Sequence, residues 1–237
     1  MKIVVLLLTV VSVVLLASRV AIRTDTPATA IAAPAPSTSF GHLAVYDSLQ
    51  LDRAGLKKDV FEYALRGWQK MGQTNPVLSI ADMSQPSTKK RLYIIDLQKK
   101  QLLFNTYVAH GQNSGDLIAN KFSNINASFQ TSLGFYKTLS TYTGKHGLSL
   151  QLKGLEKGIN DQVQNRNIVL HGADYASEEF IKKTGRLGRS QGCPAVPYAD
   201  SKQIIPVVKG GTCLFVYAPN PDYIAGSAFL SNPYTSL

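Results

Sequence analysis

Cysteine is scarce in this sequence. The 237 residues include two, Cys193 and Cys213, which excludes a disulfide-dense scaffold and a four-cysteine zinc site. A single disulfide between them is possible only in an oxidising compartment. The four histidines have irregular spacing and no nearby carboxylate partner, which disfavours a His/His/Cys metal site. We therefore expect neither a metal nor another cofactor.

Acidic residues are also in short supply. Asp and Glu number 15 against 25 Lys and Arg, so the formal net charge is +10. Such a surface favours an anionic partner, such as anionic lipid or an acidic wall polymer, or serves only for solvation. The basic residues form one run, Lys89-Lys90-Arg91, and no RNP, zinc-finger or helix-turn-helix pattern accompanies them. Nucleic acid is therefore not an expected partner.

The long apolar run lies at the start of the sequence. Lys2 precedes Ile3–Ala17, and Arg19 and Arg23 follow. This pattern predicts a signal peptide or an uncleaved N-terminal anchor over residues 1–23. Residues 24–41 are rich in Pro, Ala, Thr and Ser and predict a flexible linker. Both interpretations imply an exported protein, free or tethered to a membrane.

Residues 42–76 have helical periodicity. We expect a short helix over residues 43–51 and a second whose apolar face includes Leu56, Val60, Phe61, Leu65 and Trp68. About thirty residues are too few for a separate core. We therefore expect these helices to pack on the domain that follows, although a separate binding module is the alternative.

From Pro86 onward the pattern changes to short β-type segments. Many short strands with glycine turns indicate a mainly β sandwich or barrel over residues 77–218, α+β overall with the N-terminal helices. A helix is expected over residues 200–209, and residues 219–237 are expected to form a loose C-terminal tail. The expected strands are residues 91–96, 101–108, 134–139, 148–152, 167–171 and 212–217.

Cys193 stands among small, polar and turn-forming residues, whereas Cys213 lies in an apolar strand typical of a buried, inert thiol. A thiol nucleophile needs a base, and His171, at the end of a predicted strand, is the candidate. Arg186 and Arg189 are expected to favour the thiolate. The alternatives are a buried structural cysteine and a hydrogen-bonded structural histidine.

The neighbours of Cys193 restrict where an oxyanion could bind. Gly192 permits a tight turn and a close approach of substrate. Pro194 has no N–H to donate. The donors must therefore be the N–H groups of Gln191, Gly192 or Cys193, or groups on a distant loop. His110 and His146 each precede a glycine and are interpreted as turn histidines near strand ends.

These motifs together resemble the murein L,D-transpeptidase (YkuD-like) catalytic domain. That family's signature is a histidine, a spacer and Ser/Thr-His-Gly-Cys, which His171 and Ser190-Gln191-Gly192-Cys193 resemble. Thr131–Tyr136 is similar to its Thr-Pro-x-Gly-x-Phe strand. A proteobacterial branch is closer still, with segments similar to 108–111, 144–147, 188–190 and 192–196. Gln191 replaces the signature histidine, and Pro194-Ala195 replaces an Arg-Asn-type pair.

The resemblance covers residues 43–218 and implies a β-sandwich enzyme of the periplasm that acts on peptidoglycan stem peptides. Cys193 would attack the meso-diaminopimelyl carbonyl of a tetrapeptide stem, release D-alanine and pass the acyl group to an amine, forming a 3–3 cross-link. Water as acceptor would give an L,D-carboxypeptidase. The implied roles are catalysis by Cys193, His171 and Gly172, and oxyanion or loop support by Gly192, Ser190 and Gln191. Arg189 is expected to bind a stem-peptide carboxylate because of its charge and not because of the motif, and Arg186 and His146 are further candidates for substrate binding.

Two further functions remain open on the sequence. A non-catalytic cell-wall-binding protein would fit the departures at Gln191 and Pro194. A cysteine peptidase with ordinary peptide substrates lacks any sign of an extended substrate groove.

Overall fold

The computed structural model describes residues 39–72 and 75–231 of the chain. The predicted signal peptide or anchor and nearly all of the predicted linker lie outside these residues. Within them, no helix is long and apolar enough to cross a membrane.

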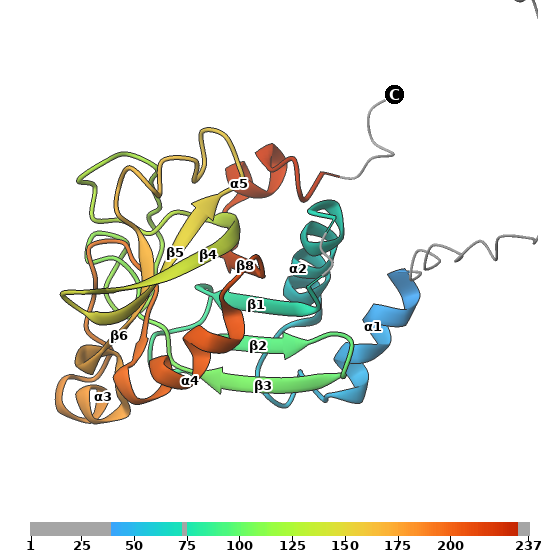
Figure 1. Ribbon diagram of the computed structural model, residues 1–237, viewed down its shortest axis with the longest axis horizontal. Coiled ribbons are helices and arrows are strands. Elements are labelled where there is room, and N and C mark those ends of the chain that lie inside the picture. Colours follow the sequence, from blue (N-terminus) through green and yellow to red (C-terminus); the bar gives the residue numbers. More distant parts are fainter. Residues whose placement is uncertain (1–38, 73–74, 232–237) are drawn as a thin grey trace, which may run out of the picture. The chain divides into compact units, whose positions relative to one another are not determined.

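Eight strands form one mixed sheet in the order β3-β2-β1-β8-β4-β5-β6-β7 (Figure 1). The pairs β1–β8 and β6–β7 are parallel, and the others are antiparallel. The strands are β1 (Val77–Asp82), β2 (Leu92–Asp96), β3 (Gln101–Thr106), β4 (Gly134–Gly144), β5 (Gly147–Gly154), β6 (Val169–Ala173), β7 (Ala195–Pro197) and β8 (Cys213–Tyr217).

The segment that follows β3, one edge strand of the sheet, pairs with β7, the other edge strand. Ala109 donates its N–H to the carbonyl of Ala195 in β7 at 2.7 Å, and Gly111 forms a bridge with Ser190. The sheet therefore curls into a barrel-like sandwich, which confirms the mainly β fold expected from the sequence. The closure brings the segment containing His110 against the loop that carries Cys193.

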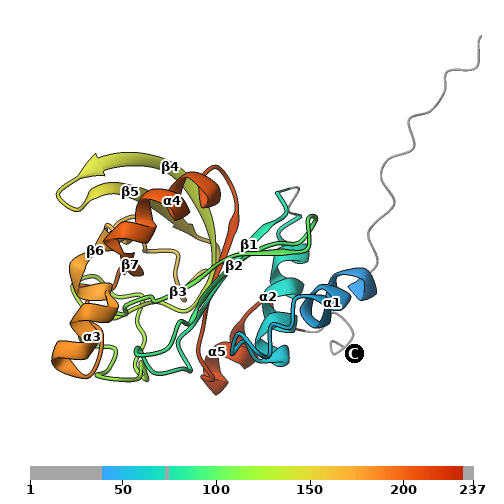
Figure 2. The ribbon, with the colours of Figure 1, turned by 90° about the horizontal axis from the view of Figure 1, so that it is seen from below.

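Two groups of helices cover this sheet. Helices α1 (Ser39–Ser48) and α2 (Lys58–Lys70) lie beside β1 and β2, and α5 (Pro221–Gly226) lies past the end of β8, while α3 (Glu178–Thr184) and α4 (Tyr198–Val208) lie near β6 and β7 (Figure 2). Helix α2 buries the apolar face that its sequence period predicts. Phe135 of β4 packs directly on α2 because Gly67 has no side chain, and a Cβ there would lie 2.1 Å from the ring.

Besides the short 3-10 turn Asp174–Ala176 and helix α5, the elements β1, β7 and α3 were not expected from the sequence. Strand β7 has three residues, and its pairing partner β6 is distant in the sequence. Helix α3 carries local signals that would have located it. Ser177 accepts a hydrogen bond from the Phe180 N–H, Glu178 lies in the first turn, and Gly185 ends the helix with a positive φ of 80°.

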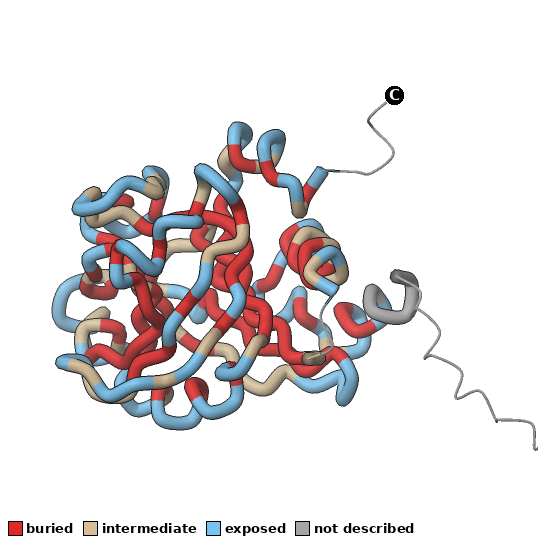
Figure 3. Tube along the Cα trace, turned by 45° about the horizontal axis from the view of Figure 1, so that its top comes forward, coloured by how far each residue is buried: buried red, intermediate tan, exposed pale blue. Residues whose placement is uncertain are grey.

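The expectation of a loose tail from residue 219 is wrong for the residues described. Helix α5 follows β8, and Tyr223 and Leu230 are buried in the main core, which Figure 3 shows as the red strands and helix faces. Glu156 anchors this segment. Its carboxylate accepts hydrogen bonds from the Phe135 N–H at 2.7 Å, the Tyr223 hydroxyl at 3.2 Å and the Ser227 hydroxyl.

Burial raises the pKa of Glu156, and its three hydrogen bonds only partly oppose the shift. The carboxyl therefore stabilises the fold below its unfolded pKa of about 4.3, and this contribution is lost as the pH rises through the folded pKa. Gln does not ionise, so we expect Glu156→Gln to remove this pH-dependent loss of stability. The stability of wild type relative to Glu156→Gln should fall as the pH rises above the unfolded pKa of about 4.3, as measured by denaturant unfolding.

Glu156→Ala serves as the control, because it leaves the Phe135 N–H without its acceptor. It should lower the free energy of unfolding by about 1–3 kcal/mol at pH 4, where the contribution of the Glu156 carboxyl is fully present. Parallel pH profiles for wild type and Glu156→Gln would contradict the prediction.

Candidate active site

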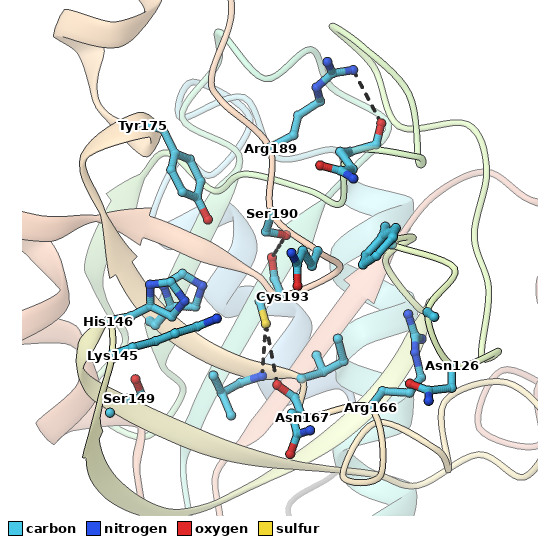
Figure 4. A pocket seen from close by; sticks show the side chains of 18 of the residues that line it. Asn126, Lys145, His146, Ser149, Arg166, Asn167, Tyr175, Arg189, Ser190 and Cys193 are labelled. Atoms are coloured by element: carbon cyan, nitrogen blue, oxygen red, sulfur yellow. Dashed lines mark hydrogen bonds between the residues drawn. The ribbon is translucent and has the colours of Figure 1, made fainter.

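A cavity of about 740 Å³ opens beside β5, β6 and the loop that carries Cys193 (Figure 4). Cys193, His171, His146, Ser190, Gln191 and Arg189 all line it, so the structure brings together most of the residues expected from the sequence. Gly192 lies in the same loop, and Gly172 follows His171 in β6. Arg186 is not among the residues that line the cavity.

The parallel pairing of β6 with β7 places the two candidate catalytic residues near each other. His171 pairs with Ala195, two residues after Cys193, and its N–H donates to the Pro194 carbonyl at 3.4 Å. On its other side His171 pairs with Ser149 of β5. The imidazole is therefore fixed in the middle of a sheet rather than on a loop.

Two contacts hold the imidazole of His171. Its Nδ1–H donates to its neighbour's carbonyl, the Gly172 oxygen, at 2.9 Å, which leaves Nε2 unprotonated and able to accept a proton. The His146 ring stacks on it with centroids 4.3 Å apart and an interplanar angle of 19°. Burial lowers the pKa of His171, the hydrogen bond to Gly172 opposes this shift, and His146 and Lys145 lower the pKa further. The neutral form needed for a base is thereby favoured.

Ser190 fixes the shape of the cysteine loop. Its hydroxyl accepts a hydrogen bond from the Gly192 N–H at 3.0 Å and donates to the Cys193 carbonyl at 2.7 Å. Gly192 has a φ of +120°, and a Cβ on it would lie 2.8 Å from the Gln130 carbonyl oxygen. A glycine is therefore required at this position.

The hydrogen bonds of this loop limit which backbone N–H groups could bind an oxyanion. The Gly192 N–H is already used by Ser190. The N–H groups of Gln191 and Cys193 have no hydrogen-bond partner within the described part of the chain. Gln191 is exposed at the cavity, so its backbone and that of Cys193 are the two donors that a bound carbonyl could reach.

The half-buried thiol of Cys193 contacts the start of β6. Its Sγ accepts the Val169 N–H at 3.5 Å and donates to the Asn167 carbonyl at 3.8 Å. No hydrogen bond joins Sγ to His171 among the residues described. Burial raises the pKa of this thiol, while the Val169 N–H, Arg166 and Lys145 oppose that shift.

The expectation that Arg186 and Arg189 stabilise the thiolate is wrong. Both pair with Asp116, whose carboxylate lies 2.6 Å from Arg186 Nε and 3.2 Å from Arg189 Nη1. The cations that act on the thiol are Arg166 and Lys145. Sequence reasoning missed both, because Arg166 precedes β6 and Lys145 lies in the β4–β5 turn, without a motif at either place.

The cavity lining is cationic. Lys145, Arg166 and Arg189 line it, and none of its lining residues is Asp or Glu. A carboxylate-bearing ligand would therefore meet attraction and no direct like-charge repulsion. Elsewhere in the residues described, no group of three or more His, Cys, Asp or Glu side chains is placed to hold a metal ion.

A family model described as the L,D-transpeptidase catalytic domain matches residues 52–217. The chain belongs to this family. The match begins before α2 and ends with β8, so it includes the cavity, β6 and the cysteine loop. No curated protein sequence matches the chain.

Several solved structures share a weaker likeness with this chain. An L,D-transpeptidase from Mycobacterium smegmatis is 14% identical, with a TM-score of 0.37 and 60% of this chain and 59% of that one covered. A variant of the helical cell shape determining protein from Campylobacter jejuni is 16% identical, with a TM-score of 0.38 and coverages of 67% and 55%. An L,D-transpeptidase from Stackebrandtia nassauensis is 15% identical, with a TM-score of 0.36 and 68% of both chains covered. The chain thus spans less than two thirds of the first two.

Both cysteines are free thiols in this transpeptidase-family domain. Cys213 is fully buried in β8, and burial raises its pKa. We expect iodoacetamide to modify the native protein once, at Cys193, as measured by intact mass and peptide mapping. Denatured protein should be modified at both cysteines, and comparable native rates at the two sites would contradict the prediction.

Proposed function

We propose that the protein is a peptidoglycan L,D-transpeptidase with Cys193 as its nucleophile and His171 as its base. The observation that carries this proposal is the position of a half-buried thiol beside a neutral, sheet-held imidazole in one cationic cavity. Family membership supplies the substrate class, which is the peptidoglycan stem peptide. An exported location in the periplasm, with or without a membrane tether, is part of the proposal.

The proposed acylation step begins with the thiol. The Cys193 thiol gives its proton to His171 Nε2, and the thiolate attacks the meso-diaminopimelyl carbonyl carbon of a tetrapeptide stem. The developing oxyanion accepts hydrogen bonds from the N–H groups of Gln191 and Cys193. The C–N bond to D-alanine breaks, and the leaving amine takes the proton from His171. A thioester on Cys193 remains.

The transfer step reverses these roles. The side-chain amine of a second diaminopimelyl residue attacks the thioester carbonyl, and His171 Nε2 accepts the amine proton. The C–S bond then breaks, the thiolate is released, and a 3–3 cross-link results. Hydrolysis by water in place of the amine would give an L,D-carboxypeptidase. Arg189 and His146 line the cavity where stem-peptide carboxylates would bind.

Replacement of the nucleophile tests this mechanism. Cys193→Ala should lower turnover of purified tetrapeptide muropeptides by several orders of magnitude, because the acyl-enzyme cannot form. Cys213→Ala is the matched control and should keep substantial activity. Mass spectrometry of the products reads release of D-alanine, cross-linked dimers and hydrolysed stems separately. Equal activity of Cys193→Ala and wild type would exclude the mechanism.

A non-catalytic cell-wall-binding protein is the second candidate. The absence of a Cys193–His171 hydrogen bond in the described residues favours it, as does Gln191 in place of the signature histidine. An enzyme of this family would be acylated by a carbapenem. We expect intact mass to show one adduct on wild type and none on Cys193→Ala. Binding to sacculi without any adduct would favour the binding protein.

A further inference from the structure

Arg166 is the most deeply buried cation at the cavity. It precedes β6, is 9% exposed and donates four hydrogen bonds to a single neighbouring loop. Nη1 donates to the Ser123 carbonyl and the Ser132 hydroxyl, both at 2.6 Å. Nη2 donates to the Gln130 carbonyl at 2.6 Å and the Ser128 hydroxyl at 3.1 Å. The guanidinium is therefore held in one orientation.

All four of these acceptors are neutral. No carboxylate lies within ion-pair distance of Arg166 in the part of the chain that the structure describes. Arg189, the other arginine of the cavity wall, has Asp116 as its partner. Burying a charge without a counter-charge costs free energy, so a nearby anion would stabilise the Arg166 guanidinium.

Two titratable groups lie close enough to interact with the Arg166 charge: Tyr136 and Cys193. Tyr136 is fully buried in β4 and donates its hydroxyl to the Ser132 carbonyl at 2.7 Å. Burial raises the pKa of that phenol, so Tyr136 stays neutral. Cys193 is therefore the group that can become the anion.

The guanidinium also lies beneath the cysteine loop. A Cβ on Gly192 would lie 3.3 Å from Arg166 Nη2, so the charge sits against the residue that precedes the nucleophile. Figure 4 shows Arg166 and Lys145 on opposite sides of Cys193. Lys145 is exposed and Arg166 is not, and solvent therefore screens the arginine less.

We propose that Arg166 is the fixed counter-charge of the Cys193 thiolate. It is a positioning residue that acts through Cys193, and it sets the fraction of thiolate before His171 takes part. The inference extends the proposed function to a residue outside the family signature, and it rests on Cys193 being the nucleophile.

Several other groups face the thiol and must be held constant in a test. Lys145 and His146 come from the β4–β5 turn, His171 from β6, and Tyr175 from the segment after β6. Burial raises the pKa of Tyr175 to about 12, so it is neutral. None of these groups is changed by a substitution at residue 166 or in its loop.

The test measures the pKa of Cys193 directly, from the pH dependence of its alkylation in a Cys213→Ala background. Arg166→Gln should raise this pKa by about 1 unit, which is about tenfold less thiolate at neutral pH. Arg166→Lys should restore most of the shift, because it keeps the charge. Arg186→Gln is the matched control and should leave the thiol pKa unchanged, since Arg186 does not line the cavity and its Nε lies 2.6 Å from the Asp116 carboxylate.

A second pair of variants retains Arg166 and supplies it with a carboxylate. The Ser128 hydroxyl lies 3.1 Å from Nη2 and is half-buried. Ser128→Asp should raise the thiol pKa. Ser128→Asn, whose side chain has the shape of Asp without the charge, should leave it unchanged. This pair decides the question if Arg166→Gln fails to fold.

An unchanged thiol pKa in Ser128→Asp, or in a folded Arg166→Gln, would overturn the inference. An equal rise in Arg166→Gln and Arg166→Lys would also overturn it, because hydrogen-bond geometry and not charge would then be responsible. Alkylation needs no turnover, so these outcomes are independent of peptidoglycan activity. The proposed function fails instead if Cys193→Ala stays active.

Discussion

The parallel pairing of β6 with β7 is the constraint on which the rest of the site depends. It aligns His171 with Ala195 and so brings two segments that are distant in the sequence to one place. Because the imidazole lies within the sheet, its orientation follows from backbone hydrogen bonds and from the Gly172 carbonyl. The closure of the sheet through Ala109 supports β7 from its other edge. A short strand of three residues is thereby held between two neighbours.

The site depends equally on which charges are paired. Arg186 and Arg189 share the single carboxylate of Asp116, and these ion pairs fix one loop against another. Arg166 instead has only neutral acceptors. Within a cavity wall that contains no carboxylate, this difference leaves Arg166 and Lys145 to act on the thiol. Low local polarity strengthens whatever charge remains unpaired.

Much of the fold could be predicted because its signals are local. Alternating and β-branched segments located β2, β3, β4, β5, β6 and β8, and the apolar face of α2 located that helix. Strand β7 could not be predicted, because three residues carry no period of their own. The tail was misjudged because the buried Glu156, which fixes α5, belongs to a different part of the chain.

The sequence by itself determined the family, the mainly β class and the residues that gather at the cavity, because motif and strand patterns lie in contiguous residues. Only the tertiary structure decided how those residues are used. Whether an arginine acts on a thiol depends on its distance, its burial and whether a carboxylate neutralises it. Arg189 and Arg166 have the same side chain, and the difference between them arises from Asp116, a residue from a distant loop.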